Sequence, residues 1–223
     1  MPASAQVLEV GSGSGLLWST NLSKIPVGWQ VILSDISPGM LIGCCTSLAP
    51  KQDQFNFEVC NAMDIPFPSG RFDAIIVNHM LYHLPDRGLA FTEIVRALKP
   101  AGTFYAATNG ETHLLEMDTL IEQNCPKTEA FIPLNRVSDF TLENGKDQLA
   151  PWFRQVERRL YQDSLEVTEA EPLVAYIRSM LPQDSEQGVN SSSPRLDMVI
   201  RQRIEQEGCF HIQKSSGIFI GKL

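Results

Sequence analysis

The sequence predicts an α/β protein in which a mostly parallel sheet is covered by helices on both faces. Short apolar runs alternate with helix-like segments five times in the first half of the chain, and strands joined by helices lie parallel. The fourth run, residues 72–79, is almost continuously apolar, as is typical of a strand buried on both sides. A glycine-rich turn directly follows the first run, which is typical of doubly wound sheets.

Five strands and the helices between them can be placed from these patterns. We expect strands at residues 6–10, 30–37, 55–62, 72–79 and 103–108. We expect helices from about Leu16, from Pro38 to Pro50 and over residues 89–98. Proline suits the first turn of a helix because its missing N–H is not needed there. The residues "KPAG" are expected to end the third helix.

The second half of the chain is less regular. The expected elements are a helix at 111–123, a loop at 140–149 around Asn144-Gly145, a strand at 155–167, and helices at about 169–181 and 194–206. Residues 182–194, which are polar and rich in serine, are expected to form a mobile loop. Two β-like runs end the sequence, and the residues Ser215-Ser216-Gly217 between them predict a hairpin.

Composition narrows the class of protein. The net charge of −8 and the absence of a basic cluster argue against a nucleic-acid partner. Five cysteines without a C-x-x-C pair predict neither a disulfide framework nor a metal site, and favour a reducing, cytoplasmic location. No apolar run reaches the eighteen or so residues of a membrane span, and no leader-like segment precedes the first strand, so no membrane association is expected.

The glycine loop, in the stretch "VLEVGSGSGLL" (residues 7–17), is compatible with two kinds of adenosine cofactor. Dinucleotide sites use G-x-G-x-x-G, but here Leu16 stands at the third glycine position and the third glycine is Gly15. Glu9 precedes the loop, and a carboxylate there is unfavourable beside a pyrophosphate but suits a ligand that carries an ammonium group. S-adenosyl-L-methionine has that group and no phosphate, so it is the favoured ligand. A purely structural turn is the alternative.

Residues at the ends of the second and third predicted strands also suit an adenosine ligand. Asp35 ends the second strand 24 residues after Gly11, close to the offset of about 20 residues at which an acid accepts hydrogen bonds from ribose hydroxyls. The same carboxylate could instead cap the following helix. After the third strand, the Asn61 side chain can reach the adenine amino group. The backbone of Ala62 and Met63 can then meet the ring nitrogens. The Met63 side chain is expected to form an apolar face against the purine, and the alternative is that it is an ordinary core residue.

Taken in order, these motifs resemble the class I S-adenosylmethionine-dependent methyltransferases, and most closely the broad ubiquinone/menaquinone-biosynthesis and trans-aconitate methyltransferase-like group. The matching segments are "LEVGSGSG", "LSDIS", "CNAMDIPFPSGRFDAIIVNHMLYHLPD" and "LKPAGTFYAAT", within residues 6–110. The resemblance implies a Rossmann-like, doubly wound, seven-stranded sheet with an antiparallel C-terminal strand or hairpin. It also implies a cofactor site made of Glu9, Gly11, Ser12, Gly13, Asp35, Ile36, Asn61, Ala62, Met63 and Asn78.

The resemblance also implies a domain organisation. Residues 1–223 are expected to form a single methyltransferase domain. It would have a cofactor-binding half at 1–110 and a substrate-side half at 111–223, with a helical insertion at about 168–208.

Three departures from the family pattern bear on function. Asn61 stands where the family usually has Asp, Ala101 replaces a glycine of the "K-P-G-G" turn, and only five residues precede the first strand. Family members generally carry helices before that strand which cover the methionine end of the cofactor, so another element is expected to supply the cover, or the chain is truncated.

Candidate substrate-binding residues follow the fourth and fifth strands, because ligands bind beyond the carboxyl ends of strands in open α/β sheets. They are His79, Tyr82, His83 and Asn109. A histidine with a pKa near neutrality could act as a base, but His83 could equally pack the loop, so no catalytic residue is assigned.

The predicted activity is methyl transfer to a small-molecule acceptor by in-line displacement. The alternative is a protein that binds S-adenosyl-L-methionine without turnover, as a regulatory or partner subunit or a truncated enzyme. The sequence does not specify the acceptor, the atom methylated or the oligomeric state.

Overall fold

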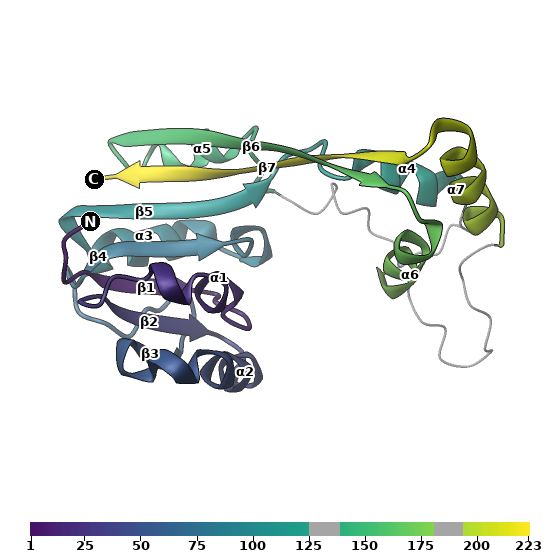
Figure 1. Ribbon diagram of the computed structural model, residues 1–223. Coiled ribbons are helices and arrows are strands. Elements are labelled where there is room, and N and C mark those ends of the chain that lie inside the picture. Colours follow the sequence, from purple (N-terminus) through teal and green to yellow (C-terminus); the bar gives the residue numbers. More distant parts are fainter. Residues whose placement is uncertain (125–138, 181–193) are drawn as a thin grey trace. The chain divides into compact units, whose positions relative to one another are not determined.

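The computed structural model describes residues 1–124, 139–180 and 194–223. Its seven strands form one sheet in the order β3-β2-β1-β4-β5-β7-β6 (Figure 1). Their bounds are β1 Gln6–Val10, β2 Gln30–Asp35, β3 Phe55–Val59, β4 Phe72–Asn78, β5 Leu98–Asn109, β6 Gln155–Val167 and β7 Phe210–Lys222. The helices are α1 Leu16–Ser19, α2 Pro38–Leu48, α3 Arg87–Ala97, α4 Leu115–Asn124, α5 Gly145–Leu149, α6 Ala170–Met180 and α7 Pro194–Glu207.

The sheet is parallel from β3 to β5, and β7 runs opposite to its neighbours β5 and β6 (Figure 1). The predicted fold class, a doubly wound and mostly parallel seven-stranded sheet with an antiparallel C-terminal strand, is therefore confirmed. Among the described helices, none is long and apolar enough to cross a membrane.

Side-chain alternation along the strands sends neighbouring residues into two different apolar clusters. Leu8 and Val10 of β1 pack with α3 residues such as Phe91, whereas Val7 packs with Trp18 of α1 and with α2. Both faces of the central strands are thus buried, which explains why their sequences are mostly apolar. The edge strand β6 is instead largely exposed along its length.

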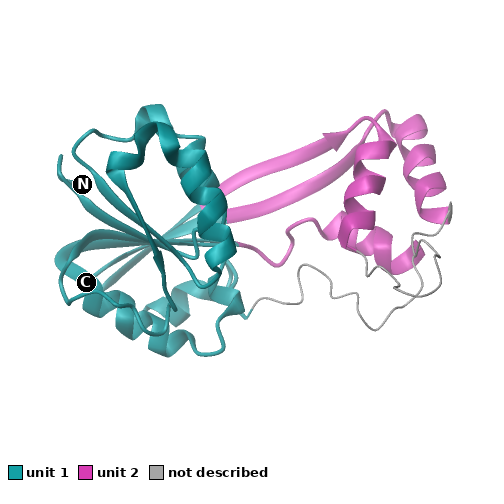
Figure 2. Cartoon of the chain, turned by 90° about the horizontal axis from the view of Figure 1, so that it is seen from below, with its two compact units in different colours: residues 1–108, 139–159, 217–223 teal, residues 109–138, 160–216 magenta. Residues whose placement is uncertain are grey.

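The chain divides into two compact units (Figure 2). The first comprises residues 1–108, 139–159 and 217–223 and contains the parallel part of the sheet. The second comprises residues 109–138 and 160–216, and its described part is α4, α6, α7 and the outer segments of β6 and β7 around a core of its own.

The predicted C-terminal hairpin is wrong, because β7 continues through Ser215-Ser216-Gly217 as one strand. A Cβ on Gly217 would lie 2.5 Å from the carbonyl oxygen of Arg159. The glycine therefore allows close packing of strands and does not mark a turn.

The loop predicted at 140–149 is also wrong, since its second half is helix α5. The Asn144 side chain accepts a hydrogen bond from the Thr141 N–H (2.9 Å), and a Cβ on Gly145 would lie 2.5 Å from the Phe219 ring. Asn144 therefore closes the bend that precedes α5, and Gly145 allows the close contact with Phe219. A turn signal in the sequence does not separate these two uses of Asn-Gly. Residues "KPAG" lie inside β5, which starts at Leu98. Most of the loop predicted at 182–194 lies outside the described residues.

Candidate cofactor site at the carboxyl edge of the sheet

The candidate site lies where the parallel strands β1, β2 and β4 end. These strands are direct neighbours with matched registers, so their carboxyl ends meet at one edge of the sheet. The glycine loop after β1, Asp35 at the end of β2 and Asn78 at the end of β4 all belong to this edge. The turn at residues 61–64 follows β3, the next strand along.

The glycine loop has a left-handed backbone at each of its glycines, with φ of 72° at Gly11, 55° at Gly13 and 74° at Gly15. A Cβ on Gly15 would lie 2.4 Å from the Cys44 sulfur, and one on Gly11 would lie 2.8 Å from Cγ of Met80. A Cβ on Gly13 would meet no atom of the described part of the chain within 4 Å. Gly11 and Gly15 therefore serve internal packing, whereas the backbone at Gly13 is open to a ligand.

Glu9 is a buried carboxylate held by two donors from different elements. Only 3% of the residue is exposed. Its Oε2 accepts a hydrogen bond from Nε1 of Trp18 (2.6 Å), and its Oε1 accepts one from Nδ2 of Asn78 (3.0 Å). Burial raises the pKa of Glu9 to about 7, and the hydrogen bonds from Trp18 and Asn78 act in the opposite direction. The site therefore holds a carboxyl group whose charge is costly without a cation beside it.

Asp35 ties the glycine loop to the start of α2. Its Oδ2 accepts a hydrogen bond from the Gly13 N–H and its Oδ1 accepts one from the Ser37 N–H, both at 2.9 Å. Each carboxylate oxygen has a second lone pair, so the group can bind a ligand hydroxyl while it holds the loop. The next residue, Ile36, is 71% exposed and offers an apolar surface beside it.

The turn after β3 is closed by its own hydrogen bonds. The Asp64 N–H donates to the Asn61 carbonyl (2.9 Å), and the Met63 N–H donates to Oδ1 of Asn61 (3.0 Å). The Asn61 oxygen is thereby engaged inside the turn, which leaves the amide nitrogen as the other polar atom of this exposed side chain. Ala62 is buried, and Met63 packs against the core.

The loop after β4 carries three of the predicted substrate-side residues. His79 has a left-handed backbone (φ 51°), which is uncommon for a residue other than glycine. By accessible surface His79 is an exposed residue. Protein atoms near its imidazole nevertheless remove part of the surrounding water, and this desolvation lowers the pKa of His79. Burial raises the pKa of Tyr82, and the Tyr82 and His83 rings meet edge to face with centroids 4.5 Å apart.

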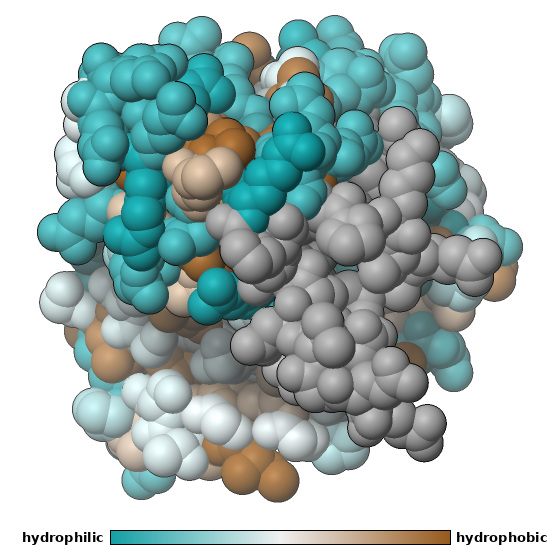
Figure 3. All heavy atoms as spheres, turned by 90° about the vertical axis from the view of Figure 1, so that its right-hand side faces the viewer, coloured by the Kyte–Doolittle hydropathy of each residue, from teal (hydrophilic) through white to brown (hydrophobic). Residues whose placement is uncertain are grey.

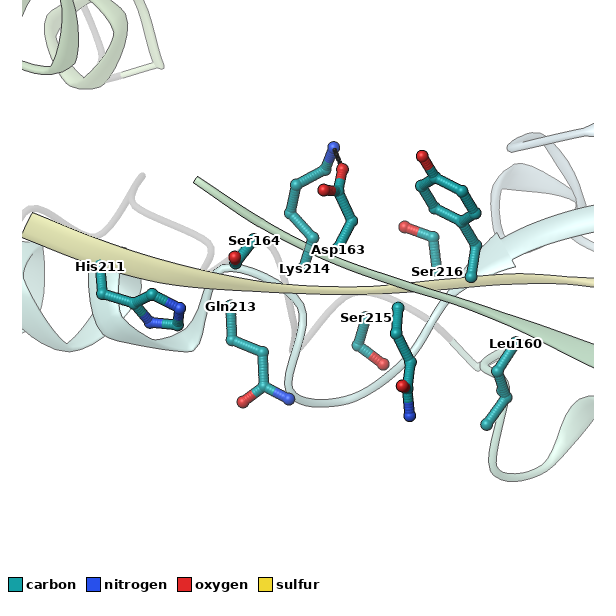
Figure 4. A pocket seen from close by; sticks show the side chains of 10 residues that line it. Leu160, Asp163, Ser164, His211, Gln213, Lys214, Ser215 and Ser216 are labelled. Carbon is teal, nitrogen blue, oxygen red and sulfur yellow. Dashed lines mark hydrogen bonds and ion pairs between the residues drawn. The ribbon is translucent and has the colours of Figure 1, made fainter. Parts of the chain in front are cut away.

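Asn109, the fourth predicted substrate-side residue, ends β5 and is the first residue of the second unit. That unit has a hollow of about 550 Å³ along the β6–β7 ribbon, lined by residues 160–164, His211 and residues 213–216. Figure 4 shows His211, Gln213 and Ser215 on one face of the ribbon and Lys214 and Ser216 on the other. Because the lining comes from both faces, the side chains do not converge on one point. Figure 3 views the side where α6 and α7 lie in Figure 1, and its described surface is mostly hydrophilic.

Two residues of the first unit were missed by sequence reasoning. Trp18 donates to Glu9, and Met80 packs over Gly11. Trp18 stands three residues after Gly15 in the short helix α1, one turn from the loop. A tryptophan so close to a buried acid was an available signal, because a buried indole N–H needs an acceptor. Nothing in the sequence distinguished Met80 from a core residue.

The residues of this edge lie within a segment that matches a known protein family. The methyltransferase domain family matches residues 8–106. These residues include the glycine loop, Asp35, the turn after β3 and the β4 loop, so the match confirms the resemblance seen in the motifs.

Relatives of known name match the same half of the chain. A demethylmenaquinone methyltransferase of Symbiobacterium thermophilum is 33% identical over 100 residues, which cover 44% of this chain and 40% of the relative. A ubiquinone/menaquinone biosynthesis C-methyltransferase of Pectobacterium atrosepticum is 29% identical over 119 residues, which cover 52% of this chain and 47% of the relative. The matched segments thus span less than half of the length of these relatives.

Solved structures match the fold over almost the whole chain. The YcgJ protein of Bacillus subtilis aligns with a TM-score of 0.62 at 17% identity and covers 98% of this chain and 92% of that one. The phosphoethanolamine N-methyltransferase 2 of Haemonchus contortus, solved with S-adenosyl-L-methionine, aligns with a TM-score of 0.59 at 20% identity and covers 100% of this chain and 49% of that one. At these identities the likeness concerns the fold.

Proposed function

We propose that this chain, whose residues 8–106 match the methyltransferase domain family, transfers a methyl group from S-adenosyl-L-methionine to a small-molecule acceptor. The observation that carries the proposal is the convergence of Glu9, the open backbone at Gly13 and Asp35 at one sheet edge. Each suits a different part of this cofactor.

The residues present fit the cofactor on chemical grounds. Glu9 is a buried carboxyl group whose charge an ammonium group would stabilise, and its two N–H donors fix its orientation. Asp35 keeps lone pairs for ribose hydroxyls while it holds Gly13 and Ser37. Among the described residues, no atom beyond the adjoining residues lies within 4 Å of a Cβ built on Gly13. The turn at residues 61–64 and Ile36 would border the adenine ring. When bound, the cofactor supplies an electrophilic sulfonium methyl group.

The chain's own task in such a reaction is to bind and align the acceptor. In-line displacement needs the nucleophile placed close to the methyl carbon and water kept away, and both are effects of positioning. His79, Tyr82 and His83 follow β4 at the edge where an acceptor would enter. Desolvation lowers the pKa of His79 and so favours its neutral form, which is the form that can take a proton from a hydroxyl acceptor.

We infer the chemical class of the acceptor from the names of the relatives. One relative compared above is named for demethylmenaquinone and the other for ubiquinone/menaquinone biosynthesis. An electron-rich aromatic hydroxyl compound is therefore the first acceptor to test. A reducing cytoplasm is the proposed location, and the four described cysteines, Cys44, Cys45, Cys60 and Cys209, are free thiols.

The binding step is tested by calorimetry of the purified chain with S-adenosyl-L-methionine and S-adenosylhomocysteine, with NAD as the control. We expect micromolar binding of both sulfur ligands and none of NAD. Binding of NAD alone would overturn the proposal.

Turnover is tested separately. Formation of S-adenosylhomocysteine should depend on a hydroquinone, catechol or amine acceptor, and mass spectrometry should find a product heavier by one methylene unit. A chain that binds the cofactor yet gives no product across the panel would contradict the enzymatic part of the proposal.

A further inference from the structure

The segment that follows the turn bordering the proposed adenine site is held to helix α3 by the side chains of Glu93 and Arg96, which form an ion pair. Glu93 and Arg96 lie one turn apart on α3 and form a forked contact, with Nε of Arg96 2.8 Å from Oε1 of Glu93 and Nη2 2.6 Å from Oε2. Both side chains also bond the backbone of the segment that follows the turn. The pair therefore connects α3 to residues 65–67.

Three backbone groups are held in this way. The Ile65 N–H donates to Oε2 of Glu93 (2.9 Å), Nη2 of Arg96 donates to the Ile65 carbonyl (2.8 Å), and Nη1 donates to the Phe67 carbonyl (2.7 Å). The hydrogen bonds from Arg96 lower the pKa of Glu93, so the carboxylate is charged in the folded protein. A bidentate contact between a guanidinium and a carboxylate fixes the orientation of both side chains.

The segment needs an external anchor because it has little sheet pairing of its own. It connects the edge strand β3 to β4, without an intervening α-helix. Besides the bonds inside the turn, the Cys60 N–H reaches the Asp35 carbonyl (3.1 Å). The Glu93–Arg96 contact fixes the other end, immediately after Asp64, while the Ile65 side chain is buried in the core.

We propose that Glu93 and Arg96 are positioning residues that fix the turn at residues 61–64 and thereby set the selectivity of the cofactor site for an adenine ring. This inference rests on the function proposed above. Neither side chain needs to touch the ligand, because each acts through the backbone of Ile65 and Phe67.

The selectivity follows from the hydrogen-bond pattern of the purine. Adenine presents an acceptor at N1 and donors at its amino group, whereas hypoxanthine presents N1–H and a carbonyl oxygen at the same places. A turn held in one position can match one pattern and reject the other, because the rejected ring leaves polar groups unpaired. A turn free to shift loses the matched bonds to adenine and adapts to both rings.

The experiment compares S-adenosylhomocysteine with S-inosylhomocysteine, which carries hypoxanthine, by calorimetry on the wild-type chain and on Arg96→Met. We expect the variant to bind S-adenosylhomocysteine about tenfold more weakly and the inosine ligand less than threefold more weakly, so that the ratio of the two dissociation constants falls. Lys99→Met is the matched control. It breaks the pair between Lys99 and Asp73 (2.7 Å) at the amino ends of β5 and β4, and should leave the ratio unchanged.

Two further variants separate positioning from stability. Arg96→Lys keeps the charge but not the fork and should resemble Arg96→Met, whereas Glu93→Gln keeps an acceptor for the Ile65 N–H and should lose less. Equal weakening for both ligands, or an unchanged ratio in every folded variant, would overturn the inference. Absence of any binding by the wild-type chain would instead refute the proposed function.

Discussion

Polar side chains gather both at the carboxyl edge of the parallel sheet and on the β6–β7 ribbon. The two regions differ in how far their charged groups are buried. At the edge, Glu9 is buried and its two oxygens accept bonds from α1 and β4. On the ribbon, the ion pair of Lys214 and Asp163 leaves 30% and 33% of the two side chains exposed. Exposed pairs are screened by water and contribute little, whereas a buried carboxyl group is costly unless something compensates it.

The difference teaches where a ligand would gain most. A cation that reaches Glu9 relieves a cost already present in the folded protein, and hydroxyl groups that reach Asp35 find a carboxylate already held by Gly13 and Ser37. On the ribbon, Lys214 and Asp163 already neutralise each other's charge, so a ligand would gain little there. The two regions should therefore respond in opposite ways to mutation, pH and ligand.

The largest effect is expected for Asp35→Ala. The variant loses two acceptors for backbone N–H groups and the proposed partner of the ribose, and hydrogen bonds to a charged group contribute about 1.5–3 kcal/mol each. We expect affinity for S-adenosylhomocysteine to fall about 100-fold by calorimetry. Asp163→Ala on the ribbon is the control and should change it less than twofold. A loss below threefold in a folded Asp35→Ala protein would remove Asp35 from the site.

The next largest effect is a pH dependence. Because the pKa of Glu9 is raised to about 7, the group is increasingly neutral below that pH and cannot pair with the ligand ammonium. Affinity for S-adenosylhomocysteine should therefore fall about tenfold per pH unit below about 7 and level off above it. Calorimetry between pH 5.5 and 8 measures this slope.

Two controls belong to that measurement. 5′-Methylthioadenosine, which lacks the amino-acid part, should bind with little pH dependence, and Glu9→Gln should abolish the slope for S-adenosylhomocysteine. The sign for folding is opposite to that for binding. A raised pKa in the folded state contributes stability below about pH 4.5, and this contribution is lost as pH rises through about 7. A slope that persists in Glu9→Gln would assign it to another group.

A smaller effect, in the direction of tighter binding, is expected for Asn61→Asp. Oδ1 of Asn61 already accepts from the Met63 N–H (3.0 Å), so the amide offers adenine mainly a donor. A carboxylate could hold the Met63 N–H with one oxygen and accept from the adenine amino group with the other. We expect affinity for S-adenosylhomocysteine to rise about threefold, and affinity for S-inosylhomocysteine not to rise. Weaker binding of S-adenosylhomocysteine would show that Asn61 does not face the adenine amino group.

The parallel half of the sheet could be predicted because local and tertiary signals agree there. The run at β4 is apolar because both faces are buried, and the three loop glycines are required by a left-handed backbone. The cofactor-site residues were predicted from the spacing of the glycine loop and Asp35 and from the family resemblance of the motifs. The prediction could not supply Trp18 as the donor to Glu9, since that contact depends on how the short α1 folds back over β1.

The C-terminal elements were harder because the same residues serve different ends. Gly217 and Gly145 are typical turn signals. In the structure, however, Gly217 makes room for the backbone of Arg159 on β6, and Gly145 makes room for the Phe219 ring. That need arises from packing between segments far apart in the sequence, which no local pattern records. The Glu93–Arg96 contact with residues 65–67 is of the same kind. Long-range packing decided these positions.

The smallest effect on the site, and the sharpest separation of the two units, is expected for a core variant of the second unit. Ile177 of α6 is fully buried among α4, α7 and β7 residues, and removal of such a side chain costs about 2–5 kcal/mol. Ile177→Ala should therefore increase hydrogen exchange at α6 and α7 amides, while affinity for S-adenosylhomocysteine changes less than twofold. Ile75→Ala in β4, equally buried, should weaken both stability and binding. If Ile177→Ala weakened binding as much as Ile75→Ala did, the carboxyl edge would depend on the second unit, and cofactor binding could not be assigned to the first unit alone.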